Sequence, residues 1–244
     1  LQCARATGDP RPRSLPEMAV EYATVSATVA TTGMVVRGGF PVDPDDDTMP
    51  PVPSLPDGRR CRTVVVVGNV GRAMWPGFRG GETAGPDPLD RWTRAQLQPI
   101  AERFGATFVH PSDEPFQPFQ RWAQRADDVW SSPIGLLVHH AYGLWHAYRG
   151  AFLFGDDVVG LPEPGAQRSP CLTCIDQPCL TTCPVDAFTA TGYDNVACAQ
   201  HVRSDREPAC LSGGCAARCA CPVGVEFRYG PDQMRFHMEA FVGS

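Results

Sequence analysis

Cysteines are the residues of this chain whose number and spacing could support chemistry. The sequence holds 11 of them, and nine fall within residues 171–221. A disulfide scaffold would spread its cysteines over a small secreted chain. A block of thiols in a chain long enough for its own core favours metal or cluster ligation in a reducing compartment. We therefore expect a cytoplasmic metal-binding or cluster-binding protein, although a leader upstream of Leu1 stays open.

The first run of cysteines is similar to a ferredoxin-type ligand set. It reads Cys171-x2-Cys174-x4-Cys179-x3-Cys183-Pro184. A [4Fe–4S] cluster needs four thiolates that converge on a cube of iron and sulfide, and short loops let one segment reach three corners. The bacterial ferredoxin run also ends in Cys-Pro, and its fourth cysteine ligates the other cluster. The middle spacing here is four residues instead of two.

A second run repeats the Cys-Pro ending and therefore indicates a second cluster. It reads Cys198, then Cys210-x4-Cys215-x3-Cys219-x-Cys221-Pro222. We expect one cluster to be ligated by Cys171, Cys174, Cys179 and Cys221. The other is then ligated by Cys183, Cys198, Cys210 and Cys215, which leaves Cys219 spare. One cluster with spare thiols, structural zinc and disulfides remain open as alternatives.

The elements before this block alternate between helix and strand patterns, which is typical of α/β or α+β architecture. Residues 62–68 predict a central strand, because continuous β-branched residues imply burial on both faces. Asp87 and Pro88 predict the start of a helix that ends at Gly105. Other strands are expected at residues 34–37, 106–110, 134–139 and 151–154, with helices at 116–125 and after a capping box at 14–17.

A proline-rich segment at residues 161–165 marks a sharp change of composition. It divides the chain into two expected domains, residues 1–165 and 166–244, the second holding the cysteine block.

Composition and charge exclude several classes of function. No apolar run approaches the roughly 18 residues that a membrane-spanning helix needs, and the net charge of -6 argues against a nucleic-acid partner. The sequence contains no lysine, which removes Schiff-base and P-loop chemistry. Gly68 and Gly71 supply only part of the dinucleotide fingerprint, so a Rossmann site is not expected.

Motifs between residues 110 and 154 resemble a known group of proteins. They are His110-Pro111-x3-Pro115, Ile134-Gly135-Leu136-Leu137-Val138-His139, Tyr142-Gly143-x-Trp145 and Tyr148-Arg149-Gly150-Ala151-Phe152-Leu153. This succession resembles the cobalamin-processing CblC family, whose fold is a modified flavin-nitroreductase α+β sandwich. A similar stretch precedes two ferredoxin-type runs in epoxyqueuosine reductase and in cobalamin-dependent reductive dehalogenases. The resemblance implies an α+β nitroreductase-like sandwich followed by a ferredoxin-type domain with two [4Fe–4S] clusters.

The resemblance also implies candidate site residues in the first domain. A corrin or flavin pocket would be lined by His139, His140, Tyr142, Trp145 and Arg149. Asp113 takes the place of the proton donor of epoxyqueuosine reductase, displaced by one position. Each of these residues could instead be an ordinary core or surface residue of a strand and turn.

The predicted function is an iron–sulfur redox protein that passes electrons to an acceptor in the first domain. The acceptor would be cobalamin, with flavin as the alternative, and an enzyme of this kind would be an oxidoreductase. We also expect a redox partner protein as the source of electrons. Two other functions remain open, a non-catalytic ferredoxin-like carrier and a cluster-bearing accessory subunit of a larger redox complex.

Overall fold

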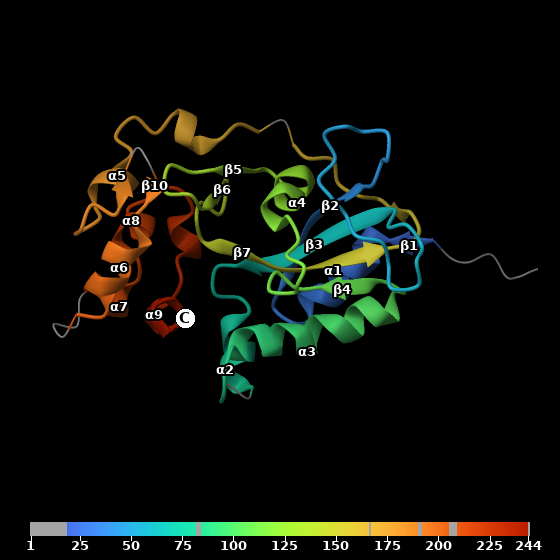
Figure 1. The fold of residues 1–244 in the computed structure, drawn as a ribbon, viewed down its shortest axis with the longest axis horizontal. Coiled ribbons are helices and arrows are strands. Elements are labelled where there is room, and N and C mark those ends of the chain that lie inside the picture. The colour runs from blue at the N-terminus through green and yellow to red at the C-terminus, as the bar shows by residue number, and fades with distance from the viewer. Residues whose placement is uncertain (1–18, 82–83, 166, 190–191, 205–208, 244) are drawn as a thin grey trace, which may run out of the picture.

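A four-stranded antiparallel sheet forms the centre of the computed structural model, which describes residues 19–81, 84–165, 167–189, 192–204 and 209–243. The strand order is β2 (Val35–Pro41), β3 (Thr63–Val70), β7 (His146–Phe154) and β4 (Thr107–Val109) (Figure 1). Every residue of β3 except Val70 is buried. The prediction of a central strand covered on both faces is therefore confirmed.

Helices cover both faces of this sheet because alternate residues of β3 point to opposite sides. Val65 and Val67 pack in one core with α1 (Tyr22–Ala30) and α3 (Pro88–Arg103). Val64 and Val66 pack in another core with α4 (Phe119–Ala126). Figure 1 shows α3 and α4 on opposite sides of the sheet, with the short helix α2 (Trp75–Gly80) after β3.

Several predicted elements change their bounds in the structure. The helix after Asp87 is confirmed, but Asp87 has a left-handed backbone and its side chain forms no capping hydrogen bond. The strand predicted at residues 134–139 shortens to β6 (Leu137–His139), because Gly135 adopts φ 78° in a turn closed by hydrogen bonds to Ser132. The capping box at residues 14–17 lies outside the described residues.

Two small strand pairs flank the central sheet. Strands β5 (Val129–Ser131) and β6 form an antiparallel hairpin, extended by a bridge between His139 and Gly143. Strands β1 (Val20–Glu21) and β8 (Val158–Val159) pair in parallel. The hairpin matters for the site because it lies between the sheet and the cysteine block (Figure 1).

The cysteine block folds into helices and an antiparallel pair of two-residue strands. They are η1 (Pro170–Leu172), α5 (Pro178–Thr181), β9 (Phe188–Thr189), β10 (Gly192–Tyr193), α6 (Asn195–Val202), α7 (Ala209–Gly213), α8 (Ala216–Cys219), η2 (Val225–Phe227) and α9 (Pro231–Gly243). The ring of Phe236 on α9 packs edge-on against Phe78 of α2, with 5.2 Å between ring centroids. The block is therefore packed onto the sheet-containing part of the chain.

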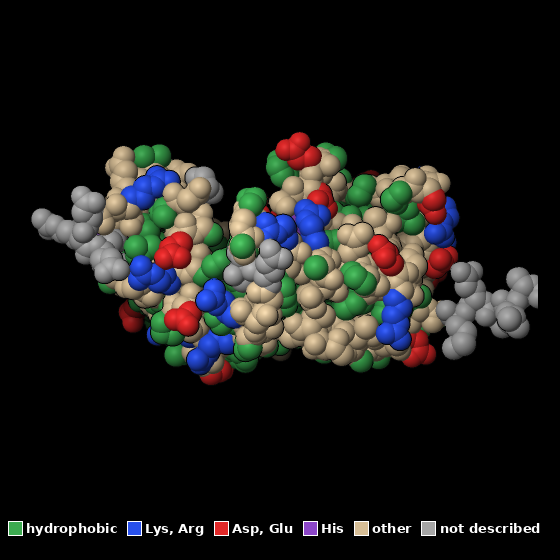
Figure 2. All heavy atoms as spheres, turned by 90° about the horizontal axis from the view of Figure 1, so that it is seen from below, with side chains coloured by type: hydrophobic (Ala, Val, Ile, Leu, Met, Phe, Trp, Pro, Cys, Tyr) green, Lys and Arg blue, Asp and Glu red, His purple; other side chains and the backbone are tan. Residues whose placement is uncertain are grey.

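The surface shows no single-sign charge field on the face drawn in Figure 2, where acidic and arginine side chains are intermixed. Within the residues that the structure describes, none of the helices combines the length and the apolar character required to cross a membrane.

Candidate functional site

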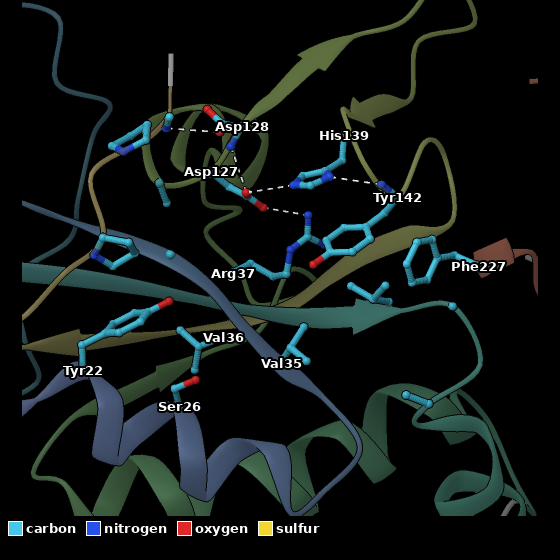
Figure 3. Close-up of a pocket in the computed structure, with 18 of the residues that line it drawn as sticks. Tyr22, Ser26, Val35, Val36, Arg37, Asp127, Asp128, His139, Tyr142 and Phe227 are labelled. Atoms are coloured by element: carbon cyan, nitrogen blue, oxygen red, sulfur yellow. Dashed lines mark hydrogen bonds and ion pairs between the residues drawn. The ribbon is translucent and has the colours of Figure 1, made fainter. Parts of the chain in front are cut away.

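A cavity of about 780 Å³ opens between the sheet, the hairpin, the proline-rich segment and η2. Its volume lies within the usual range of small-molecule sites. The lining includes Val35, Val36 and Arg37 of β2, His139 and Tyr142 of the hairpin, and Phe227 of η2 (Figure 3). We refer to this space as the large cavity.

A buried ion pair forms the polar side of the large cavity. Nη2 of Arg37 lies 2.7 Å from Oδ2 of Asp127, and the Tyr148 hydroxyl donates to the same oxygen at 2.9 Å. The Arg37 guanidinium also lies over the rings of Tyr142 and Tyr148, 5.2 and 5.1 Å from their centroids. These contacts fix the guanidinium between a carboxylate and two aromatic faces.

His139 is held in one tautomer by backbone groups. Its Nδ1 accepts hydrogen bonds from the backbone N–H groups of Ala141 and Tyr142, at 3.0 and 3.2 Å. The ring proton therefore lies on Nε2, which faces Oδ1 of Asp127 at 3.5 Å. The Tyr142 ring stacks on the imidazole with 4.2 Å between centroids. With both nitrogens engaged, the imidazole offers an aromatic face rather than a free ligand atom.

The surroundings of Asp127 keep it ionised. Burial opposes its charge, but the hydrogen bond from His139 and the charge of Arg37 outweigh burial and lower the pKa of Asp127 to about 2. Burial raises the pKa of Tyr148 above its ordinary value. At neutral pH the site therefore combines a carboxylate, a guanidinium and a protonated phenol.

The structure divides the five residues predicted for a corrin or flavin pocket. His139 and Tyr142 line the large cavity. The ring of His140 contacts that of His139 at a tilt of 31°, but His140 is exposed and does not line this cavity. Trp145 is 1% exposed and packs against Tyr229 in the core. The remaining residue, Arg149, lines a different cavity.

Asp113 lies in the loop after β4 and not in the large cavity. Its Oδ1 pairs with Arg94 at 2.6 Å, and its Oδ2 accepts the backbone N–H of His110 at 2.7 Å. Burial raises the pKa of Asp113, but these two partners outweigh burial and lower it. The group is therefore a paired carboxylate in this structure, and its role as a proton donor stays a prediction.

Sequence reasoning missed Arg37 and Asp127, which form the polar centre of the site. A signal for Arg37 was available, because it is the one charged residue in the predicted strand at 34–37. A charge inside a buried strand requires a partner. Nothing in the sequence pattern indicates that this partner is Asp127, directly after α4.

Four cysteines line a second, small and apolar cavity on the far side of the hairpin. They are Cys171, Cys174, Cys179 and Cys221, and the cavity also contacts Val138 and Leu144. Burial raises the pKa of the Cys179 thiol, and the neighbouring thiols of Cys171 and Cys221 raise it further. We call this group the first quartet. Within the described part of the chain, no three His, Cys, Asp or Glu side chains are arranged to hold a single metal ion.

The other four predicted ligands also influence one another. Burial raises the pKa of Cys210, and the nearby thiols of Cys198 and Cys183 act in the same direction. Burial also raises the pKa of Cys215, and among the neighbouring thiols Cys198 and Cys210 raise it further. We call Cys183, Cys198, Cys210 and Cys215 the second quartet. Burial also raises the pKa of Cys219, to which Cys210 contributes, and the Cys219 Sγ is directed to the carbonyl of Gly213 at 3.6 Å.

Two glycines let the cysteine block pack directly against the hairpin. Gly143 has φ 55°, and a Cβ there would lie 2.0 Å from the carbonyl oxygen of Val223. A Cβ on Gly224 would lie 2.3 Å from the carbonyl carbon of Tyr142. Backbone meets backbone at this point, two residues after Cys221, so the first quartet and the hairpin form one packed unit.

No protein-family model matches this sequence, and no curated protein sequence matches it. Among solved structures, the B12-trafficking protein CblC of C. elegans superposes with a TM-score of 0.50 at 13% identity, covering 90% of this chain and 95% of that one. Selenomethionine-labelled epoxyqueuosine reductase superposes with a TM-score of 0.50 at 11% identity, covering 87% and 68%. A second structure of epoxyqueuosine reductase, with a modified tRNA stem loop, gives a TM-score of 0.46 at 12% identity, covering 87% and 69%. On the first two comparisons, the chain is a mixed helix-and-sheet protein whose fold is similar to those of CblC and epoxyqueuosine reductase.

Proposed function

We propose that this chain is an iron–sulfur redox protein that passes electrons from two [4Fe–4S] clusters to a small molecule in the large cavity. The observation that carries the proposal is the position of the hairpin. Its Val138 lines the cysteine cavity of the first quartet, and the next residue, His139, lines the large cavity. One short strand therefore separates the proposed electron source from the proposed acceptor.

The first quartet fits a cluster better than a single ion. Its four thiols surround a cavity, whereas no three ligand side chains among the described residues converge on one point. A cube of iron and sulfide places its thiolates farther apart than one zinc ion does, and its ligands are Cys thiolates. The apolar lining by Val138 and Leu144 would exclude water, which is one of the factors that set a cluster's potential.

The second quartet supports the same proposal through the crossing of ligands. Cys183 is the last cysteine of the first run, but its charge acts on Cys210, and it influences Tyr193 together with Cys198 and Cys215. Cys221 is the last cysteine of the second run, but it lines the cavity of the first quartet. This exchange of the two Cys-Pro cysteines is the arrangement found in two-cluster ferredoxins. When bound, the clusters would supply one-electron transfer.

Aromatic side chains connect the cysteine block with the large cavity. The Tyr142 ring stacks on His139 and meets the edge of the Phe227 ring at 4.9 Å between centroids. Both Tyr142 and Phe227 line the cavity. Phe227 is the last residue of the short helix η2, which comes shortly after Cys221 in the sequence. A planar acceptor in the cavity would thus contact rings that pack on the segment holding the first quartet.

Cobalamin is the first candidate for the acceptor, and flavin is the alternative. Both are flat molecules with polar edges, which suits the apolar Val35 and Val36, the ring face of Tyr142 and the polar Arg37–Asp127 pair. The similar fold of a B12-trafficking protein favours the corrinoid. A cavity of about 780 Å³ would enclose only part of a corrin ring. The rest of the corrin would then face solvent or a partner protein.

A carrier without its own substrate chemistry is the second candidate function. It is favoured by the pairing of the acidic and basic groups, since Asp127 contacts both Arg37 and His139, and Nδ1 of His139 accepts from the backbone. No free acid or base remains in this set for proton transfer to a substrate. In either function the electrons would come from a redox partner protein.

Anaerobic titration tests the acceptor. Cobalamin and, separately, FMN are added to the purified protein, and the spectrum of each cofactor is followed. Saturable binding tighter than about 10 μM, or roughly -7 kcal/mol, is expected for one of them. Dithionite-reduced protein, freed of excess reductant, should then reduce the bound cofactor. Flat titrations with both would exclude an acceptor in the cavity and leave the carrier function.

A further inference from the structure

A third cavity, of about 340 Å³, is lined by residues of the hairpin, β7 and the cysteine block and shares no lining residue with the large cavity. Among the described residues, its charged and titratable lining consists of two arginines, two histidines and two tyrosines, without a carboxylate. These residues are Arg149, Arg218, His146, His237, Tyr148 and Tyr229. In a chain with a net charge of -6, this is a local concentration of positive charge.

Neither arginine forms an ion pair with a carboxylate among the described residues, although the charge of Asp90 opposes the lowering of the pKa of Arg149 by burial. Nε of Arg149 donates to Oδ1 of Asn69 at 3.0 Å, and Nε of Arg218 donates to the Leu144 carbonyl at 3.0 Å. Arg218 also lies over the Tyr229 ring, 4.6 Å from its centroid. No carboxylate of the described chain forms an ion pair with either guanidinium. Charges that are withdrawn from water in this way usually have an anionic partner.

The two histidines leave hydrogen-bonding atoms without partners. His146 is 7% exposed, and neither of its ring nitrogens has a partner among the described residues. Nε2 of His237 is also buried without one. Burial, followed by the charge of Arg37 for His146 and of Arg149 for His237, lowers the pKa of each ring to about 3. Both rings are therefore neutral at neutral pH, and each can donate one N–H group.

We propose that this cavity binds the carboxylate or phosphate group of a small organic anion. A guanidinium binds both groups through paired N–H donors. The unpartnered imidazole N–H groups supply further donors. The cavity is several times larger than an inorganic ion, and Leu136, Leu137 and Leu144 give it an apolar wall for the rest of the ligand. The proposal does not depend on clusters or on an acceptor in the large cavity.

Calorimetric titration of the purified protein under anaerobic conditions, with inorganic phosphate and with malonate as probes, tests this site. Saturable binding of at least one probe is expected, and the preferred probe distinguishes a phosphate ligand from a carboxylate ligand. Arg149→Gln and His146→Asn should each weaken binding about tenfold or more, because each removes a donor that faces the ligand. The matched control is Arg121→Gln, which removes the same charge from an exposed position on α4.

The outcomes separate clearly. Circular dichroism checks that each variant keeps the fold, and Arg149→Lys serves as a second variant that retains the charge but not the paired donors. Absence of saturable binding by both probes would overturn the proposal. Equal weakening by Arg121→Gln and Arg149→Gln would also overturn it, because the effect would then come from overall charge. Since iron content and redox activity play no part, a failure here leaves the proposed redox function untouched.

Discussion

Val138 and His139 are consecutive residues of β6, and they line different cavities. Val138 contacts the cavity of the first quartet, and His139 lines the large cavity. This follows from strand geometry, in which successive side chains point to opposite faces. The relationship gives the hairpin a specific role, because a single strand contributes to the cavity of the thiols and to the cavity of the proposed acceptor.

Serine substitutions should separate ligands from the spare thiol. Cys171→Ser and Cys221→Ser should each lose one cluster, or about four irons, because both thiols line the same cavity. Cys219→Ser is the matched control and should retain full iron, since Cys219 packs with Trp145, Tyr229 and Met234. Iron analysis of anaerobic protein measures both. Loss of iron from Cys219→Ser with full iron in Cys221→Ser would reassign the ligand.

Removal of the Asp127 carboxylate should destabilise the chain. Asp127→Asn leaves the buried Arg37 without its counter-ion, for which we expect a loss of about 3 kcal/mol of unfolding free energy. Denaturant unfolding followed by tryptophan fluorescence measures it. Asp157→Asn removes the partner of Arg62 at the surface and should cause no measurable change. An equal effect of the two substitutions would show that the buried ion pair contributes no more to the unfolding free energy than the surface pair does.

Stability should fall as the pH is lowered from 7.5 to 5.5. His146 and His237 have native pKa values of about 3, below the ordinary value of 6.5. The unfolded chain therefore takes up protons in this window that the native chain does not, and each ring should contribute a loss of roughly 1 kcal/mol. The unfolding free energy of His146→Asn should vary less with pH than that of the wild type. An unchanged pH dependence in this variant would contradict a neutral, buried His146.

Gly143 should be needed for the contact between hairpin and cysteine block. Gly143→Ala would place a Cβ 2.0 Å from the Val223 carbonyl oxygen, and we expect a loss of at least about 2 kcal/mol. Gly135→Ala is the matched control, because Gly135 also has a positive φ but no atom within 4 Å of the added carbon. It should cost only about 1 kcal/mol of backbone strain. Comparable unfolding midpoints for the two variants would argue against a tight contact at Gly143.

Local patterns predicted the central strand, because four consecutive valines at residues 64–67 indicate a strand that is buried on both faces. The same holds for the helix after Asp87, whose start and end signals lie in the sequence. The strand at residues 134–139 was predicted too long, because a turn at Gly135 interrupts an otherwise apolar run. Hydrophobic content alone does not distinguish a strand from a turn that happens to be apolar.

The candidate site was only partly predictable, because tertiary folding assembles it. His139 and Tyr142 came from local motifs, and the structure places both in the large cavity. Arg149 was assigned to the same pocket through the resemblance to cobalamin-handling families, but it lies in β7 and lines the third cavity. The Arg37–Asp127 pair joins β2 to the end of α4, and no local spacing reports such a contact. In contrast, short spacing predicts that Cys171, Cys174 and Cys179 lie together. The grouping of Cys221 with them came from the Cys-Pro pattern of ferredoxin-type runs, and ligation by all four remains a prediction.

The absorption spectrum of the protein purified without oxygen, combined with iron and sulfide analysis, tests the central claim most directly. Two [4Fe–4S] clusters require brown protein with about eight irons and eight acid-labile sulfides per chain. The same spectrum reports any corrinoid or flavin that co-purifies. Colourless protein that contains zinc and no sulfide would contradict the account, because the two quartets would then bind no redox-active cluster that could pass electrons to the large cavity.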